Sequence, residues 1–415
     1  MAQNGRYHRD SFMSAQIQGR YFGKGAPLFK LYFITAIFTV LTLGIYRFWA
    51  KTRIRKYIWS SVSGDDDSFE YTGTGLEKFL GFLVAIVILA IYLGVIQLLL
   101  TFIGFSIIPQ DNSPQAILGQ SIAINLSILA VLPLMLFAQY RARRYKMARS
   151  RWRGIRFGME NGAWGYVARA VGYGILTVIS FGILAPLATY RLEKYMADRS
   201  WYGDGRFEQT GRWQDLYKGM KHIFIGLALI VVSAVLLAMG GGNDQIALAI
   251  LGGIGLFVGY FWLLIGVVFY RVYAFNYLTG KKVLDGQVSF AAQLETSTIL
   301  AKVIVGGIVI SVLMGVIFAV IAGVGAAVFA GAGATGELGA GSIVGVIVIV
   351  ILYALAFLVA GGLGLVMITQ PVIEHAVNNV TVHNAGHLDT IRQRSADSFA
   401  DADGFADALD VGGAI

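Results

Sequence analysis

Six long runs of apolar residues dominate the chain, and polar connections separate them. A helix needs about 20 predominantly apolar residues to cross roughly 30 Å of hydrocarbon. Most runs reach this length, and the shortest becomes adequate once the flanking His222 and Gly240–Gly242 are included. The pattern therefore predicts six transmembrane helices. They cover Phe79–Phe105, Ala116–Ala138, Ile223–Met239, Ile246–Phe269, Val303–Ala332 and Ser342–Ile368.

The polar connections between these runs are of two kinds. One kind contains no Lys or Arg, as in Phe105–Ala116, Gly240–Gln245 and Ala332–Gly341. The other kind is densely basic, and the positive-inside rule places it in the cytoplasm. This rule also predicts a cytoplasmic N-terminus and C-terminus. The basic connections are Arg47–Lys56, Arg141–Arg156, Arg191–Lys221 and Arg271–Lys282.

Two further apolar segments, Leu28–Leu43 and Tyr166–Ala185, each lie between two segments assigned to the cytoplasm. A single full crossing would place consecutive basic blocks on opposite sides of the membrane. We therefore expect these segments to be re-entrant or interfacial helices that break at Gly44 and Gly182. Eight full crossings are the alternative that hydropathy alone favours.

A basic stripe follows the first of these breaks. Within Ile45–Trp59, the side chains of Arg47, Lys51 and Arg55 recur every four residues and so share one helical face. This pattern is typical of an amphipathic helix that lies on a membrane surface.

The chain contains an internal repeat, because residues 39–81 recur without a gap as residues 177–219. Identical pairs include Thr39 with Thr177 and Gly81 with Gly219. The repeat predicts two tandem units in parallel orientation, residues 20–157 and 158–295. Residues 296–374 then supply the last helix pair. Residues 1–19 form an N-terminal tail, and residues 375–415 form a polar, acidic and disordered C-terminal tail.

A looser pattern occurs four times: an Arg that an aromatic residue precedes in three of the copies, an aromatic four residues after that Arg, a turn with glycine, and a Phe. Tyr and Trp prefer the headgroup layer and Arg reaches phosphates, so the pattern suits helices leaving a membrane. The turns predict small cytoplasmic β-hairpins. A structural role is the simpler interpretation, and binding of an anionic ligand is the alternative. The candidate contacts to lipid headgroups are Arg53, Tyr57, Arg141, Tyr145, Arg191, Tyr195 and Arg271.

The same residues carry a resemblance to a known family. The run Leu41–Lys51 (LTLGIYRFWAK), preceded by Phe22–Gly25 and followed by Phe69–Gly73, resembles the YjgN-like family of bacterial inner-membrane proteins. The similarity extends over most of the chain, from about Phe22 to Gln370. It implies a polytopic inner-membrane protein of a family without an established biochemical role, so no catalytic residue is transferred.

Composition agrees with a membrane protein. Of 415 residues, 56% are hydrophobic and 14% are charged, whereas soluble domains carry about 25% charged residues. The net charge of +9 comes from basic residues beside the apolar runs, which indicates contact with anionic lipid headgroups rather than nucleic acid. The absence of cysteine excludes disulfides and thiolate chemistry.

Candidate chemistry is sparse. The predicted spans contain no charged residue or histidine in their interiors, where ion-coupled transporters usually carry them. Gln97, Gln120 and Asn125 are candidates to line a polar cavity, and hydrogen bonds between helices are the simpler interpretation. The acidic run Asp65–Asp67 and the pair His383 and His387 favour a solvated turn and a polar loop over metal sites. We therefore expect no catalytic residue, metal or cofactor.

Two classes of function remain. The first is a transporter or channel for a small solute or lipid, which the duplicated bundle and the re-entrant segments favour. The second is a non-catalytic scaffold that organises lipids or partner proteins. Glycines such as Gly255 and Gly259, and the group Gly361–Gly364, allow close helix packing within the chain or in a homo-oligomer.

Overall fold

The computed structural model describes residues 16–109, 111, 113–241, 245–335 and 340–394. Parts of both predicted tails and of all three predicted outer loops lie outside these residues. Within them, six helices are long and apolar enough to cross a membrane, and many of their large apolar side chains are exposed. The six predicted spans are therefore confirmed as helices. They are Gly75–Phe102, Pro114–Ala148, Trp213–Gly240, Ile246–Gly280, Thr296–Ala330 and Ile343–Asn378.

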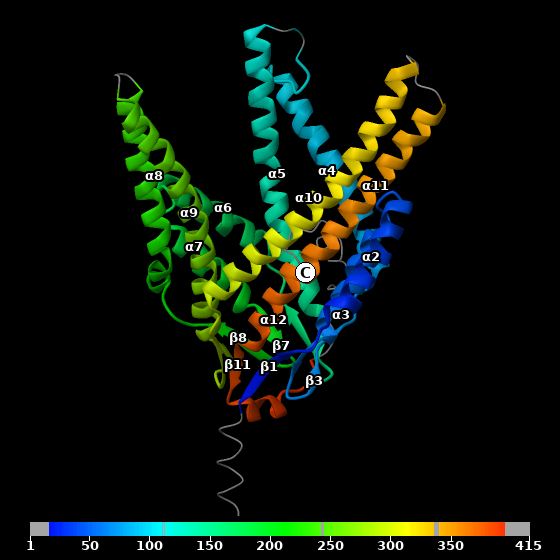
Figure 1. Ribbon diagram of the computed structural model, residues 1–415. Coiled ribbons are helices and arrows are strands. Elements are labelled where there is room, and N and C mark those ends of the chain that lie inside the picture. Colours follow the sequence, from blue (N-terminus) through cyan, green and yellow to red (C-terminus); the bar gives the residue numbers. More distant parts are fainter. Residues whose placement is uncertain (1–15, 110, 112, 242–244, 336–339, 395–415) are drawn as a thin grey trace, which may run out of the picture.

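These helices form three long pairs that splay apart from a common base (Figure 1). The first pair is α4 (Gly75–Phe102) and α5 (Pro114–Ala148). The 3₁₀ helix η1 (Trp213–Met220) leads into the second pair, α8 (Lys221–Gly240) and α9 (Ile246–Gly280). The third pair is α10 (Thr296–Thr335) and α11 (Ala340–Gly364), which continues through the π-helix η2 (Leu365–Thr369) into α12 (Gln370–Asn378).

Two shorter helix pairs stand beside them. They are α2 (Gly25–Leu41) with α3 (Arg47–Ser60), and α6 (Ala163–Ile179) with α7 (Ala185–Ala197). The turns have the same geometry, with positive φ at Leu43 and Gly44 and again at Phe181 and Gly182. In each turn the glycine N–H donates to a threonine carbonyl five residues earlier, at 2.7 Å. The repeated sequence thus has one local structure in both places.

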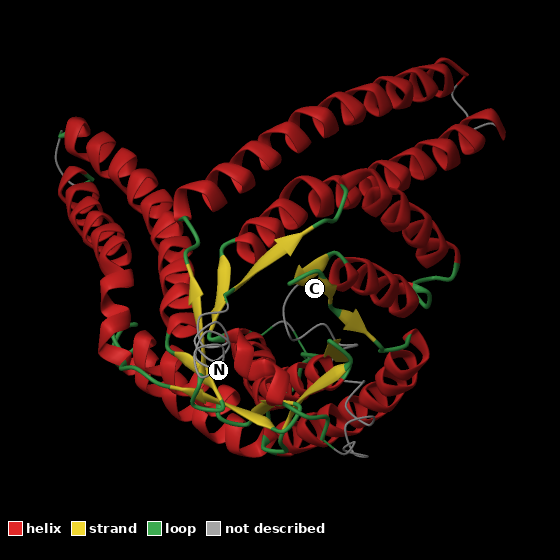
Figure 2. Cartoon of the chain, turned by 90° about the horizontal axis from the view of Figure 1, so that it is seen from below, coloured by secondary structure: helices red, strands yellow, loops and turns green. Residues whose placement is uncertain are grey.

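The strands form one sheet of eleven strands, and every neighbouring pair in it is antiparallel. Its order is β3-β2-β1-β11-β10-β9-β8-β7-β6-β5-β4. The two end strands, β3 and β4, are separated by Phe69 alone, so the sheet curves into a nearly closed barrel, the strand ring (Figure 2). The strands are β1 (Ile17–Tyr21), β2 (Val62–Gly64), β3 (Asp67–Ser68), β4 (Glu70–Tyr71), β5 (Ser150–Trp152), β6 (Ile155–Met159), β7 (Ser200–Tyr202), β8 (Gly205–Gln209), β9 (Lys282–Leu284), β10 (Val288–Ala292) and β11 (Val380–His383).

The strand ring corrects the prediction of an all-α protein with separate small hairpins. The chain is mostly helical, but the hairpins join edge to edge. A two-stranded hairpin leaves unpaired N–H and C=O groups on both edges, and pairing with the next hairpin satisfies them. Phe157 of β6 pairs with Tyr202 of β7 in this way, and Phe207 of β8 pairs with Leu284 of β9.

The strand ring also brings together the two ends of the described chain. Ile17 of β1 lies opposite Val382 of β11. Residues 375–394, which composition assigned to a C-terminal tail, form the end of α12, the strand β11 and the 3₁₀ helix η3 (Ala385–Thr390). The described chain therefore repeats one path five times: a strand of the ring, a helix pair, and a return to the ring.

Candidate functional site

The strand ring encloses an apolar cavity of about 290 Å³, which we call the lumen. Most of its lining comes from strand residues that point inward. At the end nearest the long helices, Phe275 of α9 and Ala376 and Val377 of α12 complete the lining. The full lining is Ile17, Gly19, Val62, Ser63, Gly64, Phe69, Trp152, Phe157, Tyr202, Phe207, Phe275, Leu284, Phe290, Ala376, Val377, Val380, Val382 and Leu388.

One recurrent sequence position supplies much of this lining. Phe69, Phe157, Phe207 and Phe290 are the final Phe of the fourfold sequence pattern, and all four line the lumen. Each lies five residues before the residue that precedes a helix. In the remaining path, which begins with β1, that position is Gly19, which has no side chain to fill the lumen. The sequence pattern contained this signal, but only the strand ring shows that the four Phe side chains line one cavity.

Residues 385–393, which we call the closing segment, lie against one end of the lumen. Leu388 and Ile391 are buried in the cluster that contains Trp152, Tyr202 and Leu284. Burial raises the pKa of Tyr202 to about 12, so its hydroxyl stays protonated at neutral pH and donates to the Trp152 carbonyl at 2.9 Å. The sequence pattern did not identify this segment, because its contacts are with residues far away in the chain.

The turns of the ring hold the closing segment in place. Arg153, in the turn between β5 and β6, pairs with Asp389 at 3.2 Å. Its guanidinium also pairs with Asp65 at 2.7 Å and Asp67 at 3.2 Å. The acidic run considered as a cation site thus contacts an arginine.

A second acidic turn contacts the histidine considered for metal binding. His387 Nε2 lies 3.0 Å from Asp285 Oδ2, in the turn between β9 and β10. A third turn contributes Asp204, whose carboxylate accepts from the Arg392 N–H at 2.8 Å. Turns from three hairpins therefore hold the closing segment.

A recurrent hydrogen bond fastens each helix pair at its base. Five side chains, each five residues before the first residue of a strand, bond to the start of the same helix pair. Four are tyrosines, and in the fifth path His375 Nε2 accepts from the Glu295 N–H at 3.1 Å. The tyrosine hydroxyls donate from Tyr57 to the Lys24 carbonyl (2.8 Å), Tyr145 to the Glu77 carboxylate (2.7 Å), Tyr195 to the Gly162 carbonyl (2.9 Å) and Tyr277 to the Arg212 carbonyl (3.0 Å).

Three of the residues expected to contact lipid headgroups, Tyr57, Tyr145 and Tyr195, thus make one of these hydrogen bonds at the base of a helix pair. In the fourth version of the sequence pattern the fastening residue is Tyr277, two residues beyond the expected Phe275. The spacing to the following strand identifies Tyr277, whereas the spacing from Arg271 does not.

The candidate arginines lie nearer the surface. Arg53, Arg191 and Arg271 are exposed, and Arg141 is partly exposed with its guanidinium 5.5 Å from the centre of the Phe137 ring. Arg191 lines a surface pocket of about 430 Å³ together with Lys194 and Arg212.

The three polar candidates in the first long pair bond within that pair. Gln97 Nε2 of α4 donates to Ser127 Oγ of α5 at 2.6 Å. Gln120 Nε2 donates to the Ile107 carbonyl at 2.9 Å, and Asn125 Nδ2 to the Ser121 carbonyl at 2.8 Å. None of the three lines the lumen.

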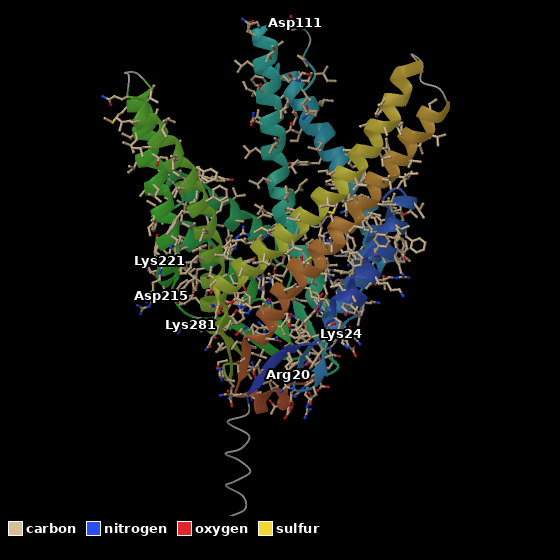
Figure 3. The ribbon with its side chains drawn as sticks, viewed as in Figure 1. Arg20, Lys24, Asp111, Asp215, Lys221 and Lys281 are labelled. Atoms are coloured by element: carbon tan, nitrogen blue, oxygen red, sulfur yellow. The ribbon has the colours of Figure 1, made fainter. Side chains whose placement is uncertain are left out.

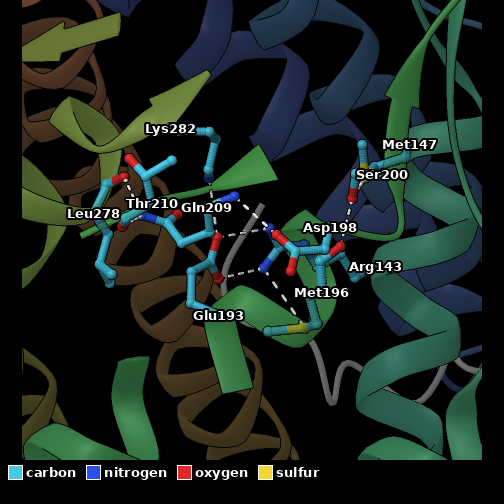
Figure 4. Close-up of polar contacts among 10 residues, drawn as sticks. All are labelled: Arg143, Met147, Glu193, Met196, Asp198, Ser200, Gln209, Thr210, Leu278 and Lys282. Atoms are coloured by element: carbon cyan, nitrogen blue, oxygen red, sulfur yellow. Dashed lines mark hydrogen bonds and ion pairs between the residues drawn. The ribbon is translucent and has the colours of Figure 1, made fainter. Parts of the chain in front are cut away.

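A charged cluster outside the ring connects three of the chain's paths (Figure 4). Glu193 of α7 accepts from both terminal nitrogens of Arg143 of α5, at 2.8 and 3.0 Å, and lies 3.0 Å from Lys282 Nζ of β9. Burial alone would raise the pKa of the Glu193 carboxyl, but Arg143 and Lys282 outweigh burial and lower it to about 2. The cluster is therefore charged at neutral pH and joins α5, α7 and β9.

The fold and the lumen define a polytopic membrane protein in which splayed helix pairs extend from a nearly closed strand ring. The chain belongs to the family described as bacterial proteins of unknown function (DUF898), whose model matches residues 16–408. It is 32% identical over 75 residues to inner membrane protein YjgN of Salmonella typhimurium, and 24% identical over 170 residues to inner membrane protein YjgN of Escherichia coli O157:H7.

These alignments cover 18% and 39% of this chain, and 19% and 38% of the two relatives. No solved structure matches the chain. The comparisons thus agree with an inner-membrane protein.

Proposed function

We propose that this protein binds the apolar part of a lipid in the lumen of its strand ring, as a step in moving that lipid. The lumen carries the proposal, because it lies inside the strand ring, is almost entirely apolar and is next to the ends of the long helices. At about 290 Å³ it is close to the lower end of the range for ligand pockets, about 300–1,000 Å³. An apolar lumen suits an acyl chain and disfavours an ion or a polar solute.

The direction of insertion forms part of the proposal. Figure 3 shows Arg20, Lys24 and Lys281 near the ring, and Asp215 and Lys221 somewhat farther from it near the start of the second long pair, whereas Asp111 lies at the far tip of the first long pair. Basic residues favour the cytoplasmic side. We therefore infer that the ring and both termini lie at the cytoplasmic face, beside anionic headgroups.

The two shorter helix pairs fit a re-entrant arrangement in this orientation. The tips carry Leu43, which is 95% exposed, and Phe181, which is 91% exposed. Large apolar side chains at equivalent tips suit insertion into hydrocarbon, and both ends of each pair return to the ring. We infer that they enter the membrane from the ring side and return to it.

Filling the lumen tests the function. Val382→Phe places a larger side chain in the lumen, whereas Thr381→Phe adds the same ring on the opposite face of β11, because neighbouring strand residues alternate. Full-length protein would be purified from bacterial membranes, and its bound lipid measured by mass spectrometry. The same proteins in liposomes would be assayed for movement of a fluorescent phospholipid between leaflets.

We expect bound lipid and lipid movement to fall in Val382→Phe and to stay at the wild-type level in Thr381→Phe. Equal values in both variants would exclude the lumen as the binding site. Correct folding of both is checked by their elution volume and melting temperature.

The second candidate is a non-catalytic scaffold, which the splayed arrangement of the three long helix pairs and their exposed apolar side chains favour (Figure 1). Apolar helix surfaces of this kind suit contact with lipids, partner helices or further copies of the chain. Under this proposal the lumen variants would have no effect on lipid movement. Cross-linking in the membrane would instead give homo-oligomers or complexes with other proteins.

A further inference from the structure

A second cavity, of about 510 Å³, lies between α2, α3 and α11. We call it the groove. Its lining contains three basic side chains from α3, polar side chains from α2, and two leucines from the segment α11–η2. Among the described residues that line it, none is acidic. The groove thus has both a positively charged wall and an apolar wall.

The basic wall is the stripe of Arg47, Lys51 and Arg55. The sequence pattern predicts that this stripe lies on a membrane surface, and the structure places it along the groove. Its two ends differ: Arg47 is exposed, whereas Arg55 is 1% exposed at the base of α3. The Arg55 guanidinium donates to the Tyr71 hydroxyl of β4 at 3.1 Å, which fixes that end of the stripe against the ring.

The wall from α2 contains Tyr32, Thr35 and Thr39. The Thr35 hydroxyl donates to the Leu31 carbonyl at 2.8 Å, and the Thr39 hydroxyl donates to the Thr35 carbonyl at 2.8 Å. Since both hydroxyl hydrogens are already used, the basic stripe is the main source of donors for a bound anion.

The third wall is apolar and is packed closely against α2. Leu358 and Leu365 line the groove from this side. A side chain at Gly361 would collide with the Tyr32 ring, and one at Gly362 with the Phe29 ring. The two glycines therefore allow α2 to approach α11 closely, so these two walls of the groove are in contact.

We propose that the groove binds an anionic phospholipid. The lipid phosphate would contact Arg47 and Lys51, and the acyl chain would lie along Leu358 and Leu365. Arg55, which is 1% exposed, would add positive charge at the base of the stripe. Arginine and lysine are the usual phosphate partners, and their bonds to a charged acceptor are stronger than neutral hydrogen bonds. The apolar wall favours a lipid over a free phosphate ion, which would leave that wall without a partner.

A charge-matched pair of variants tests the site. The groove variant is Arg47→Gln with Lys51→Gln, and the control is Lys30→Gln with Lys56→Gln. Both remove two positive charges from the pair α2–α3, but Lys30 and Lys56 are exposed and do not line the groove. Full-length protein in detergent would be titrated with phosphatidylglycerol or phosphatidylcholine, and lipid binding would be followed by native mass spectrometry.

We expect wild type and the control to bind phosphatidylglycerol more tightly than phosphatidylcholine. The groove variant should bind phosphatidylglycerol about tenfold more weakly or worse, because each lost charged bond is worth about a factor of ten. A variant that keeps the charges, Arg47→Lys with Lys51→Arg, should retain most of the binding. This variant separates loss of charge from damage to the fold.

Three results would overturn the proposal. One is equal weakening in the control, and another is equal binding of the two lipids by wild type. The third is displacement of phosphatidylglycerol by excess inorganic phosphate, which would show a site for a free anion. The groove lies outside the ring, so Val382→Phe leaves it intact, and failure at the lumen is distinguishable from failure here.

Discussion

The guanidinium of Arg153 lies 3.2 Å from the carboxylate of Asp389, and this pair joins the turn between β5 and β6 to the closing segment. The same guanidinium pairs with Asp65 and Asp67 in the turn between β2 and β3. One side chain therefore holds two turns of the ring and the segment that lies against the end of its lumen.

Replacing Arg153 should loosen the closing segment. Only the pair with Asp389 reaches the closing segment, and a partly exposed ion pair is worth roughly 0.2–1 kcal/mol, so Arg153→Gln should weaken this contact by up to about 1 kcal/mol. Amide hydrogen exchange across residues 385–393 should become up to about fivefold faster. Arg151→Gln, on the neighbouring strand β5, is the control and should leave exchange unchanged. The same exchange rate in both variants would mean that the buried Leu388 and Ile391 alone hold the segment.

Neutralising Glu193 should destabilise the whole protein. Glu193→Gln leaves the charges of Arg143 and Lys282 without their shared partner. Breaking a buried pair costs about 3–5 kcal/mol, and because these side chains are 19–32% exposed we expect a smaller loss, of about 1–3 kcal/mol. The melting temperature in detergent should fall clearly. Glu208→Gln removes the same charge from an exposed position on β8 and should change the melting temperature little. Equal melting temperatures would show that the cluster contributes no net stability.

The contribution of Glu193 should also depend on pH. Its folded pKa of about 2 lies below the ordinary value of 4.5, so the folded state favours the charged carboxylate. The stabilisation is complete above about pH 4.5 and is lost as the pH falls toward 2. The difference in melting temperature between wild type and Glu193→Gln should therefore be constant near neutral pH and shrink in acid. A difference that grows in acid would contradict this sign.

Removing one fastening hydroxyl should have a modest effect. Tyr195→Phe deletes the 2.9 Å hydrogen bond to the Gly162 carbonyl and keeps the aromatic side chain. The free energy of unfolding should therefore fall by about 0.5–1.5 kcal/mol. Protease cleavage near the base of α6 should become faster. Tyr260→Phe, at an exposed position on α9, is the matched control. If cleavage is unchanged in Tyr195→Phe, the fastening bond is not needed to hold the pair.

Because the chain has no cysteine, single cysteines can report the topology. Asp111→Cys should react with a membrane-impermeant maleimide added outside the inner membrane. Lys281→Cys should react only after the membrane is opened. Leu43→Cys and Phe181→Cys should react from neither side if the short pairs are re-entrant. Labelling of Leu43→Cys and Phe181→Cys from outside would instead support eight crossings.

Local sequence determined the helices of this protein. The apolar runs predict all six long helices, because a helix satisfies its own backbone hydrogen bonds and an apolar run of this length suits hydrocarbon. The repeat of residues 39–81 likewise identified two turns with the same geometry at Gly44 and Gly182. These features depend on neighbours in the chain, so the chain alone is sufficient to predict them.

Tertiary structure decided how the helix pairs combine. Short strands such as Ser150–Trp152 need partners from other parts of the chain, and nothing in their own sequence selects those partners. Only the assembled strand ring therefore shows that four distant Phe side chains line one lumen, namely Phe69, Phe157, Phe207 and Phe290. The stripe of Arg47, Lys51 and Arg55 was evident in the sequence, but the groove also needs Leu358 of α11, which lies 303 residues beyond Arg55. Contacts between distant segments depend on three-dimensional packing, which local periodicity does not encode.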